Sequence, residues 1–240
     1  MKRIVYVPTL AIALAAGALA QTAADLPTVD QILAKNIEAS GGKAALEKLN
    51  SRVEKGTIEV VTFGVSGPIE MYAKAPNKQF SRSTFEGYGE VLQGFDGKTG
   101  WVKTPDAGLR EMSGAELDRA KRSADFHRSL HLKEQYAKMT VIGKGKVGDR
   151  DAFIVEAKLS EGPTEKFYFE AQTGLLARVE IPDESGGQAT TSLEDYKEVD
   201  GVKIPHTIRQ ESAAFSLTIK FSEVHHNVEI DDAKFAKPAN

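Results

Sequence analysis

Apolar and polar positions alternate with a period of two along most of this chain. In residues 69–74, Ile69, Met71 and Ala73 alternate with less apolar neighbours, and residues 153–158 repeat the pattern. This period is typical of a strand with one buried face. Turn residues such as Asp96-Gly97 separate the strands at short intervals, and short connections favour antiparallel neighbours. The pattern therefore predicts a mainly β chain with helices (α+β), built on an antiparallel curved sheet of about 11 or 12 strands.

Two stretches follow the helical period instead. Thr28 and Gln31 form a capping-box pattern ahead of an apolar face, with Gly41-Gly42 as the stop and a second short helical piece over 43–49. In mid-chain, Ser113 and Glu116 repeat the capping-box pattern and open a charged helical segment. This insertion, about 113–132, is expected to lie against a face or an open end of the sheet. At the C-terminus, Phe235 is expected to dock a short tail onto the core.

The N-terminus has the features of an export signal. Lys2 and Arg3 precede an apolar run, and Ala18-Leu19-Ala20 fits the small-x-small rule for cleavage. The run is broken by Pro8, and the chain has no Cys that could be lipidated. We therefore expect a protein released into a bacterial periplasm or outside the cell, and the periplasm is the location assigned. The predicted organisation is a cleaved signal peptide over 1–20, a flexible spacer over 21–27 and a single folded domain over 28–240.

Composition narrows the range of possible functions. Cleavage after Ala20 would remove two of the 31 basic residues and none of the 34 acidic ones, so 29 − 34 leaves a net charge of −5. A mildly acidic chain gives no electrostatic reason to expect nucleic acid. The absence of Cys excludes disulfides, thiolate zinc sites and Cys nucleophiles. No cofactor is expected.

The histidines are the strongest candidates for chemistry. His127 and His131 are one helical turn apart, with Asp125 nearby, so they could face the same way and hold a metal. No third ligand is evident, and catalytic zinc sites usually use three protein ligands. The pair is therefore better explained as an exposed helical face, and a metal-dependent hydrolase stays the weaker alternative. His225 and His226 should point to opposite faces of a strand. The pattern favours a chain that is not an enzyme.

Several segments together resemble the periplasmic lipoprotein-carrier superfamily, whose members include LolA-like lipoprotein-sorting proteins and their LolB, RseB and LppX relatives. The resemblance spans about Thr28 to Phe235. It is carried by residues 38–42 (EASGG), 71–78 (MYAKAPNK), 94–101 (GFDGKTGW), 168–176 (YFEAQTGLL) and 195–205 (DYKEVDGVKIP). The resemblance implies a half-barrel whose concave apolar face accommodates acyl chains, with residues 113–132 as a lid. It implies no Arg-based latch, because this chain has Lys74-Ala75-Pro76 where well-studied carriers have an Arg-Pro pair.

The resulting expectation is a non-enzymatic periplasmic carrier that binds a lipid or a lipoprotein acyl chain. An inner-membrane transporter and an outer-membrane acceptor are candidate partners, and the carrier is expected to be a monomer. An envelope sensor or protein-interaction module on the same fold is the alternative. Apolar residues alone do not distinguish a filled core from a lined cavity. The residues chosen as candidate lining are Met71, Phe80, Phe95, Trp101, Phe126, Leu130, Phe167 and Phe169.

Overall fold

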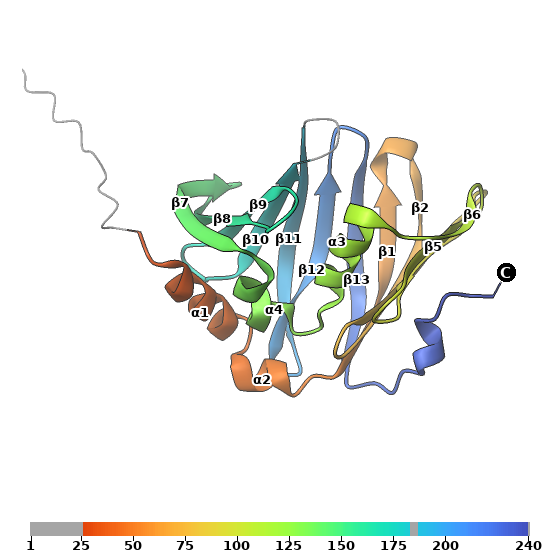
Figure 1. Cartoon of the computed structure of the whole chain (residues 1–240), viewed down its shortest axis with the longest axis horizontal. Coiled ribbons are helices and arrows are strands. Elements are labelled where there is room, and N and C mark those ends of the chain that lie inside the picture. The colour runs from red at the N-terminus through yellow and green to blue at the C-terminus, as the bar shows by residue number, and fades with distance from the viewer. Residues whose placement is uncertain (1–25, 183–186, 240) are drawn as a thin grey trace, which may run out of the picture.

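All strands of the described residues join one sheet. The computed structural model describes residues 26–182 and 187–239, so the predicted signal peptide and most of the predicted spacer lie outside the described residues. Thirteen strands join in the order β6-β5-β4-β3-β2-β1-β13-β12-β11-β10-β9-β8-β7 (Figure 1). Their bounds are β1 Ser51–Val60, β2 Val65–Lys74, β3 Lys78–Phe85, β4 Gly89–Phe95, β5 Gly100–Thr104, β6 Gly108–Glu111, β7 Lys138–Val147, β8 Arg150–Lys158, β9 Thr164–Glu170, β10 Leu176–Pro182, β11 Gln188–Val199, β12 Val202–Glu211 and β13 Ser216–His226.

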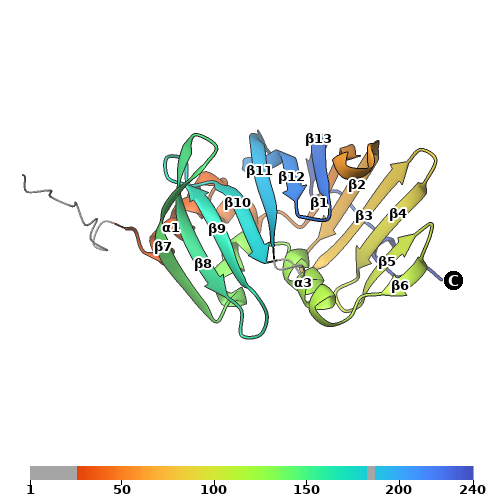
Figure 2. The same ribbon diagram turned by 90° about the horizontal axis from the view of Figure 1, so that it is seen from above.

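The sheet is antiparallel at every pairing and strongly curved. The strands from β1 to β6 and those from β7 to β13 each follow the sequence order, and the pairing of β1 with β13 joins the two runs. Figure 2 shows the sheet bent into an open trough, with β7–β10 as one arm and β3–β6 as the other. The predicted mainly β fold with an antiparallel curved sheet is confirmed, with thirteen strands where 11 or 12 were expected.

Helix α1 (Val29–Ala39) begins at the predicted capping box. The Thr28 hydroxyl accepts a hydrogen bond from the backbone N–H of Gln31 (3.2 Å), and the Gln31 side-chain oxygen accepts one from the backbone N–H of Thr28 (2.8 Å). The short α2 (Lys43–Glu47) follows. No helix among the described residues is both long and apolar enough to cross a membrane.

The helical insertion is divided into α3 (Gly114–Ala124), α4 (Arg128–His131) and the 3₁₀ turn η3 (Leu132–Gln135). The predicted capping box at Ser113 is wrong, since its hydroxyl makes no capping hydrogen bond. Glu116 instead binds both terminal nitrogens of Arg110, at 2.7 and 2.8 Å. A two-pronged charged contact of this kind is stronger than a single neutral hydrogen bond. Residues 113–135 are called the lid below, and Figure 2 shows α3 in the mouth of the trough.

The concave side of the sheet, called the inner face, is covered by helices on both arms. On one arm, α1 and η3 pack on the strands β8 and β9 through a cluster that comprises Ile32, Leu33, Leu132, Tyr136, Val155, Ala157, Leu159, Phe167 and Phe169. On the other arm, Ala120 and Ala124 of α3 pack on Phe95 and Met112. The middle of the trough lies between these two contacts.

The C-terminal tail covers the opposite, outer face. Phe235, next to the 3₁₀ turn η4 (Asp232–Lys234), is fully buried in a cluster with Trp101 and Phe80. The indole N–H of Trp101 donates to the carbonyl of Phe235 at 3.0 Å. The predicted docking of Phe235 onto the core is therefore confirmed.

Candidate ligand-binding interior

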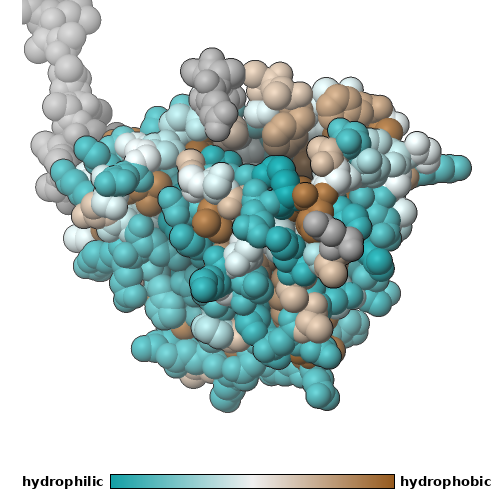
Figure 3. Space-filling model, turned by 45° about the vertical axis from the view of Figure 1, so that its right-hand side comes forward, coloured by the Kyte–Doolittle hydropathy of each residue, from teal (hydrophilic) through white to brown (hydrophobic). Residues whose placement is uncertain are grey.

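An apolar hollow opens at one end of the inner face, beside the turn η2 (Val61–Phe63) that links β1 to β2. It encloses about 570 Å³ and is lined by Ile58, Val60, Phe63, Val65, Ser83, Phe85, Tyr88 and Val91. Phe63 and Tyr88 at its rim are 71% and 43% exposed. Figure 3 shows hydrophobic side chains gathered along the upper rim of a mostly hydrophilic surface. Large apolar side chains clustered at a rim often mark a binding site.

A second space, called the polar cavity, lies on the same face between the sheet and the link from α3 to α4. It encloses about 410 Å³. Its lining comprises Arg52, Glu54, Met71, Tyr72, Ala73, Gln79, Phe80, Ser81 and Gln93 from one arm, Ser123, Ala124, Asp125, Phe126 and Arg128 from the lid, and Thr191, Leu193, Ile208 and Gln210 from β11 and β12. The pairing of β1 with β13 brings these distant strands to one site.

The apolar hollow and the polar cavity adjoin along β3 and β4. Ser83 and Val91 border the hollow, whereas Ser81 and Gln93 border the cavity. Every second residue of a strand faces the same way, and Ser83 pairs with Val91 as Ser81 pairs with Gln93. Along β4 the lining therefore changes from Val91 to Gln93 within two residues, while β3 presents a serine to each space.

Two further spaces share lining residues with the polar cavity. Arg52, Phe126 and Leu193 border a space of about 210 Å³ toward α2 as well. Thr191 and Gln210 border a further space of about 440 Å³, which lies at the end of β10, the start of β11 and the end of β12. These spaces lie between the packed clusters of the inner face.

Two carboxylates of the polar cavity have partners close by. Glu54, whose side chain is only 8% exposed, lies 3.1 Å from Nε of Arg52. Asp125 accepts hydrogen bonds from the side-chain amide of Gln135 and from the backbone N–H of His127, both at 3.1 Å. The carboxylate of Glu54 is thus paired with a cation, whereas that of Asp125 is held by neutral donors.

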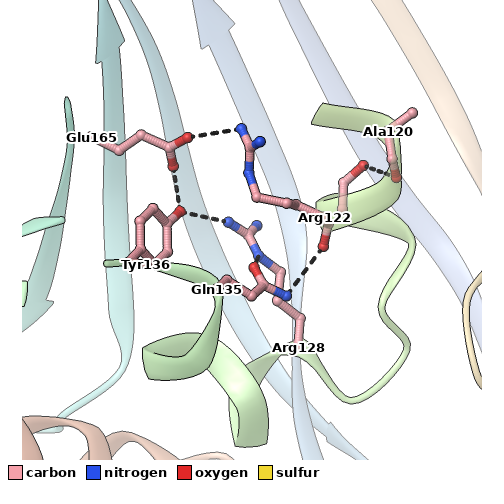
Figure 4. A network of polar contacts seen from close by, with 7 residues as sticks. Ala120, Arg122, Arg128, Gln135, Tyr136 and Glu165 are labelled. Carbon is pink, nitrogen blue, oxygen red and sulfur yellow. Dashed lines mark hydrogen bonds and ion pairs between the residues drawn. The ribbon is translucent and has the colours of Figure 1, made fainter. Parts of the chain in front are cut away.

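A network of polar contacts joins the lid to strand β9 (Figure 4). The buried carboxylate of Glu165 accepts a hydrogen bond from the Tyr136 hydroxyl at 2.6 Å and one from Nη2 of Arg122 at 3.3 Å. Arg128 donates to the Tyr136 oxygen (3.4 Å) and to Gln135 Oε1 (3.2 Å). Burial raises the pKa of the Tyr136 phenol above its ordinary value, so the hydroxyl keeps its proton and remains a donor to Glu165.

The structure distributes the predicted lining residues over both faces of the sheet. Met71 and Phe126 border the polar cavity together. Phe95 lies on the inner face but is covered by α3. Phe80 borders the polar cavity, yet its ring packs against that of Trp101, with centroids 6.0 Å apart, beneath the C-terminal tail. Trp101 is buried in that same cluster.

The remaining three predicted residues lie toward the other arm. Phe167 and Phe169 stack at a centroid distance of 6.4 Å within the cluster beneath α1 and η3. Leu130 lies half-buried in α4. Sequence reasoning did not select the residues of the apolar hollow. The sequence does show apolar positions on either side of the turns at 61–64 and 86–88. Which face of the sheet these positions occupy depends on the strand register.

The histidines do not converge on one site. His127 Nε2 lies 3.0 Å from the carbonyl of Leu49, and His131 Nδ1 lies 3.3 Å from Asp125. Within the ranges 26–182 and 187–239, no group of three or more His, Asp or Glu side chains could hold a metal ion. His225 and His226 point to opposite sides as expected, with side-chain exposures of 61% and 1%.

Comparison with known proteins identifies the fold of the chain. No family model matches the chain, and no curated protein matches it. Among solved structures, a LolA superfamily protein from Nitrosomonas europaea superimposes with a TM-score of 0.60 at 15% identity, covering 88% of this chain and 99% of that one. An outer membrane lipoprotein-sorting protein domain from Vibrio parahaemolyticus gives a TM-score of 0.60 at 14% identity, with coverages of 87% and 97%. A DUF1329 family protein from Desulfovibrio piger gives 0.59 at 15% identity, with the same coverages. The chain therefore has the fold of the LolA superfamily, as the resemblance implied.

Proposed function

We propose that this protein is a non-enzymatic carrier that binds an acyl chain in the apolar hollow and moves it between membranes. The observation that carries the proposal is the hollow itself. Its volume of about 570 Å³ falls within the range of about 300–1,000 Å³ that is usual for ligand pockets. Burial of each methylene contributes about 0.8 kcal/mol, so such a hollow can hold an acyl chain without covalent chemistry.

The carrier is proposed to act in the periplasm as a single domain over 28–240, after removal of residues 1–20. The LolA-like fold supports this, and the Vibrio parahaemolyticus neighbour is described as a lipoprotein-sorting domain. A lipoprotein or lipid is the proposed cargo. An inner-membrane transporter and an outer-membrane acceptor are the proposed partners, and the carrier itself is proposed to be a monomer.

The first test is to purify the full chain from its native cell envelope and to analyse extracted lipids by mass spectrometry. The carrier should contain an acyl lipid in near-stoichiometric amount. Titration with single-chain lipids should then show affinity rising about fourfold for each added methylene. Absence of lipid together with no dependence on chain length would refute the carrier, and a stable protein complex without lipid would favour the interaction module instead.

A matched pair of variants locates the site. Val91→Glu places a carboxylate in the apolar hollow, and it should weaken acyl binding at least tenfold. Val228→Glu is the control, because Val228 is 41% exposed and borders none of the spaces described above. Equal loss of binding in both variants would place the acyl chain outside the hollow.

A further inference from the structure

The lid residue Arg128 is distinguished by the lack of a compensating carboxylate. It borders the polar cavity, and its guanidinium is hydrogen-bonded only to neutral partners, Gln135 and Tyr136. No ion pair joins it to a carboxylate among the described residues. Arg52, the other cation of the cavity, is paired with Glu54. Arg128 is thus the cation of the cavity that has no ion pair among the described residues, while Asp125, the second carboxylate of the cavity, accepts hydrogen bonds from Gln135 and His127.

Neutral polar groups surround the same space. The side-chain amides of Gln93 and Gln210 border the cavity and make no hydrogen bond with other described residues. Gln93 is exposed and Gln210 half-buried, so both amides are hydrated and can donate to a polar group of a ligand instead of to water.

The apolar hollow limits the number of chains. If a methylene takes up about the volume of a water molecule, about 30 Å³, the 570 Å³ of the hollow correspond to one long chain. Because the polar cavity begins two residues farther along β3 and β4, the head group of that chain would lie near the lid.

We propose that the cargo is a long-chain fatty acid, with its chain in the apolar hollow and its carboxylate bound by Arg128. A planar carboxylate matches the planar guanidinium, and Arg128 has no carboxylate partner of its own among the described residues. The inference rests on the proposed carrier function and adds the chemical class of the head group to it.

The test compares palmitate with methyl palmitate, which has the same chain but no charge. Both are measured by displacement of a fluorescent acyl probe from the full chain. The protein should bind palmitate about 10- to 100-fold more tightly than the ester, the usual effect of a charge-assisted hydrogen bond. In Arg128→Gln the ratio should fall to near one. Arg128→Lys should retain part of the preference, because it keeps the charge but loses the planar guanidinium.

The ratio of the two affinities distinguishes a head-group effect from a loosened lid, because a loosened lid would weaken the binding of palmitate and of its ester alike. Arg82→Gln is the control, because Arg82 pairs with Glu90 outside these spaces. A ratio unchanged in Arg128→Gln, or no preference in the wild type, would overturn the assignment. So would tighter binding of a single-chain phosphate lipid than of palmitate. If neither palmitate nor its ester binds, the carrier proposal itself fails.

Discussion

Replacing Arg122 by glutamine should destabilise the protein, because the carboxylate of Glu165 would lose its cation while it remains buried. The Glu165 side chain is 3% exposed and that of Arg122 is 21% exposed. Breaking a fully buried pair costs about 3–5 kcal/mol. Since Arg122 is partly hydrated, we expect about 2–3 kcal/mol for Arg122→Gln. Glu165→Gln keeps an acceptor for Tyr136 and removes the charge, so it should cost about 1 kcal/mol.

A double-mutant cycle isolates the contact. The Arg122→Gln/Glu165→Gln protein should be more stable than Arg122→Gln alone, with a coupling of about 1–2 kcal/mol. Urea unfolding of the four proteins measures these values. Arg110→Gln is the matched control, since its pair with Glu116 is 51% and 43% exposed and should contribute less than about 1 kcal/mol. Additive effects, or an Arg122→Gln midpoint equal to that of the wild type, would refute the buried pair.

Three further predictions concern the outer face. Hydrogen bonding to Lys74 is the foremost cause that lowers the pKa of Asp232 from 3.8 to about 2. Because the pKa is lower in the folded state, Asp232 stabilises the fold above about pH 4 and this contribution is lost as the pH falls toward about 2. Melting curves of Asp232→Asn and wild type should accordingly differ at neutral pH and converge in acid. Phe235→Ala should cost about 3–5 kcal/mol and shift the emission of Trp101, the single tryptophan, to longer wavelength; unchanged emission would contradict the docking of the tail. Gly94→Ala should cost about 1–3 kcal/mol in urea unfolding, because its Cβ would lie 2.4 Å from the ring of Trp101; a midpoint equal to that of the wild type would contradict that contact.

Local chemistry made much of the fold predictable. The period of two and the turn residues identify the antiparallel strands, and the capping box at Thr28 places α1. At Ser113 the same local pattern failed because Arg110, three residues before it, offers Glu116 a charged partner. A capping motif therefore predicts a helix start reliably only where no stronger partner competes for its side chains.

The candidate site was harder to predict because it depends on register and on pairings between distant strands. Met71 and Phe80 were chosen by the same criterion, yet Met71 pairs with Ser81 on the inner face and Phe80 pairs with Tyr72 toward the outer one. A shift of one residue would exchange these faces. The contribution of Thr191 and Gln210 to the polar cavity requires the pairing of β1 with β13, which no local pattern specifies.

The two attachments of the lid differ in a way that bears on ligand entry. On the arm formed by β4 and β5, α3 is held through the small side chains of Ala120 and Ala124, whereas toward β9 it is held by the contact of Arg122 with Glu165. Separating this contact would uncover Phe95 and Met112, which are buried beneath α3, at a cost of about 0.8 kcal/mol per exposed methylene. Separating the ion pair leaves the Glu165 carboxylate without its cation. Water can hydrate this carboxylate once the mouth of the trough opens. Removal of the Arg122 cation leaves the apolar contact of α3 with Phe95 and Met112 unchanged, so it loosens the lid only on the side of β9. Arg122→Gln should therefore speed ligand exchange even where the chain remains folded.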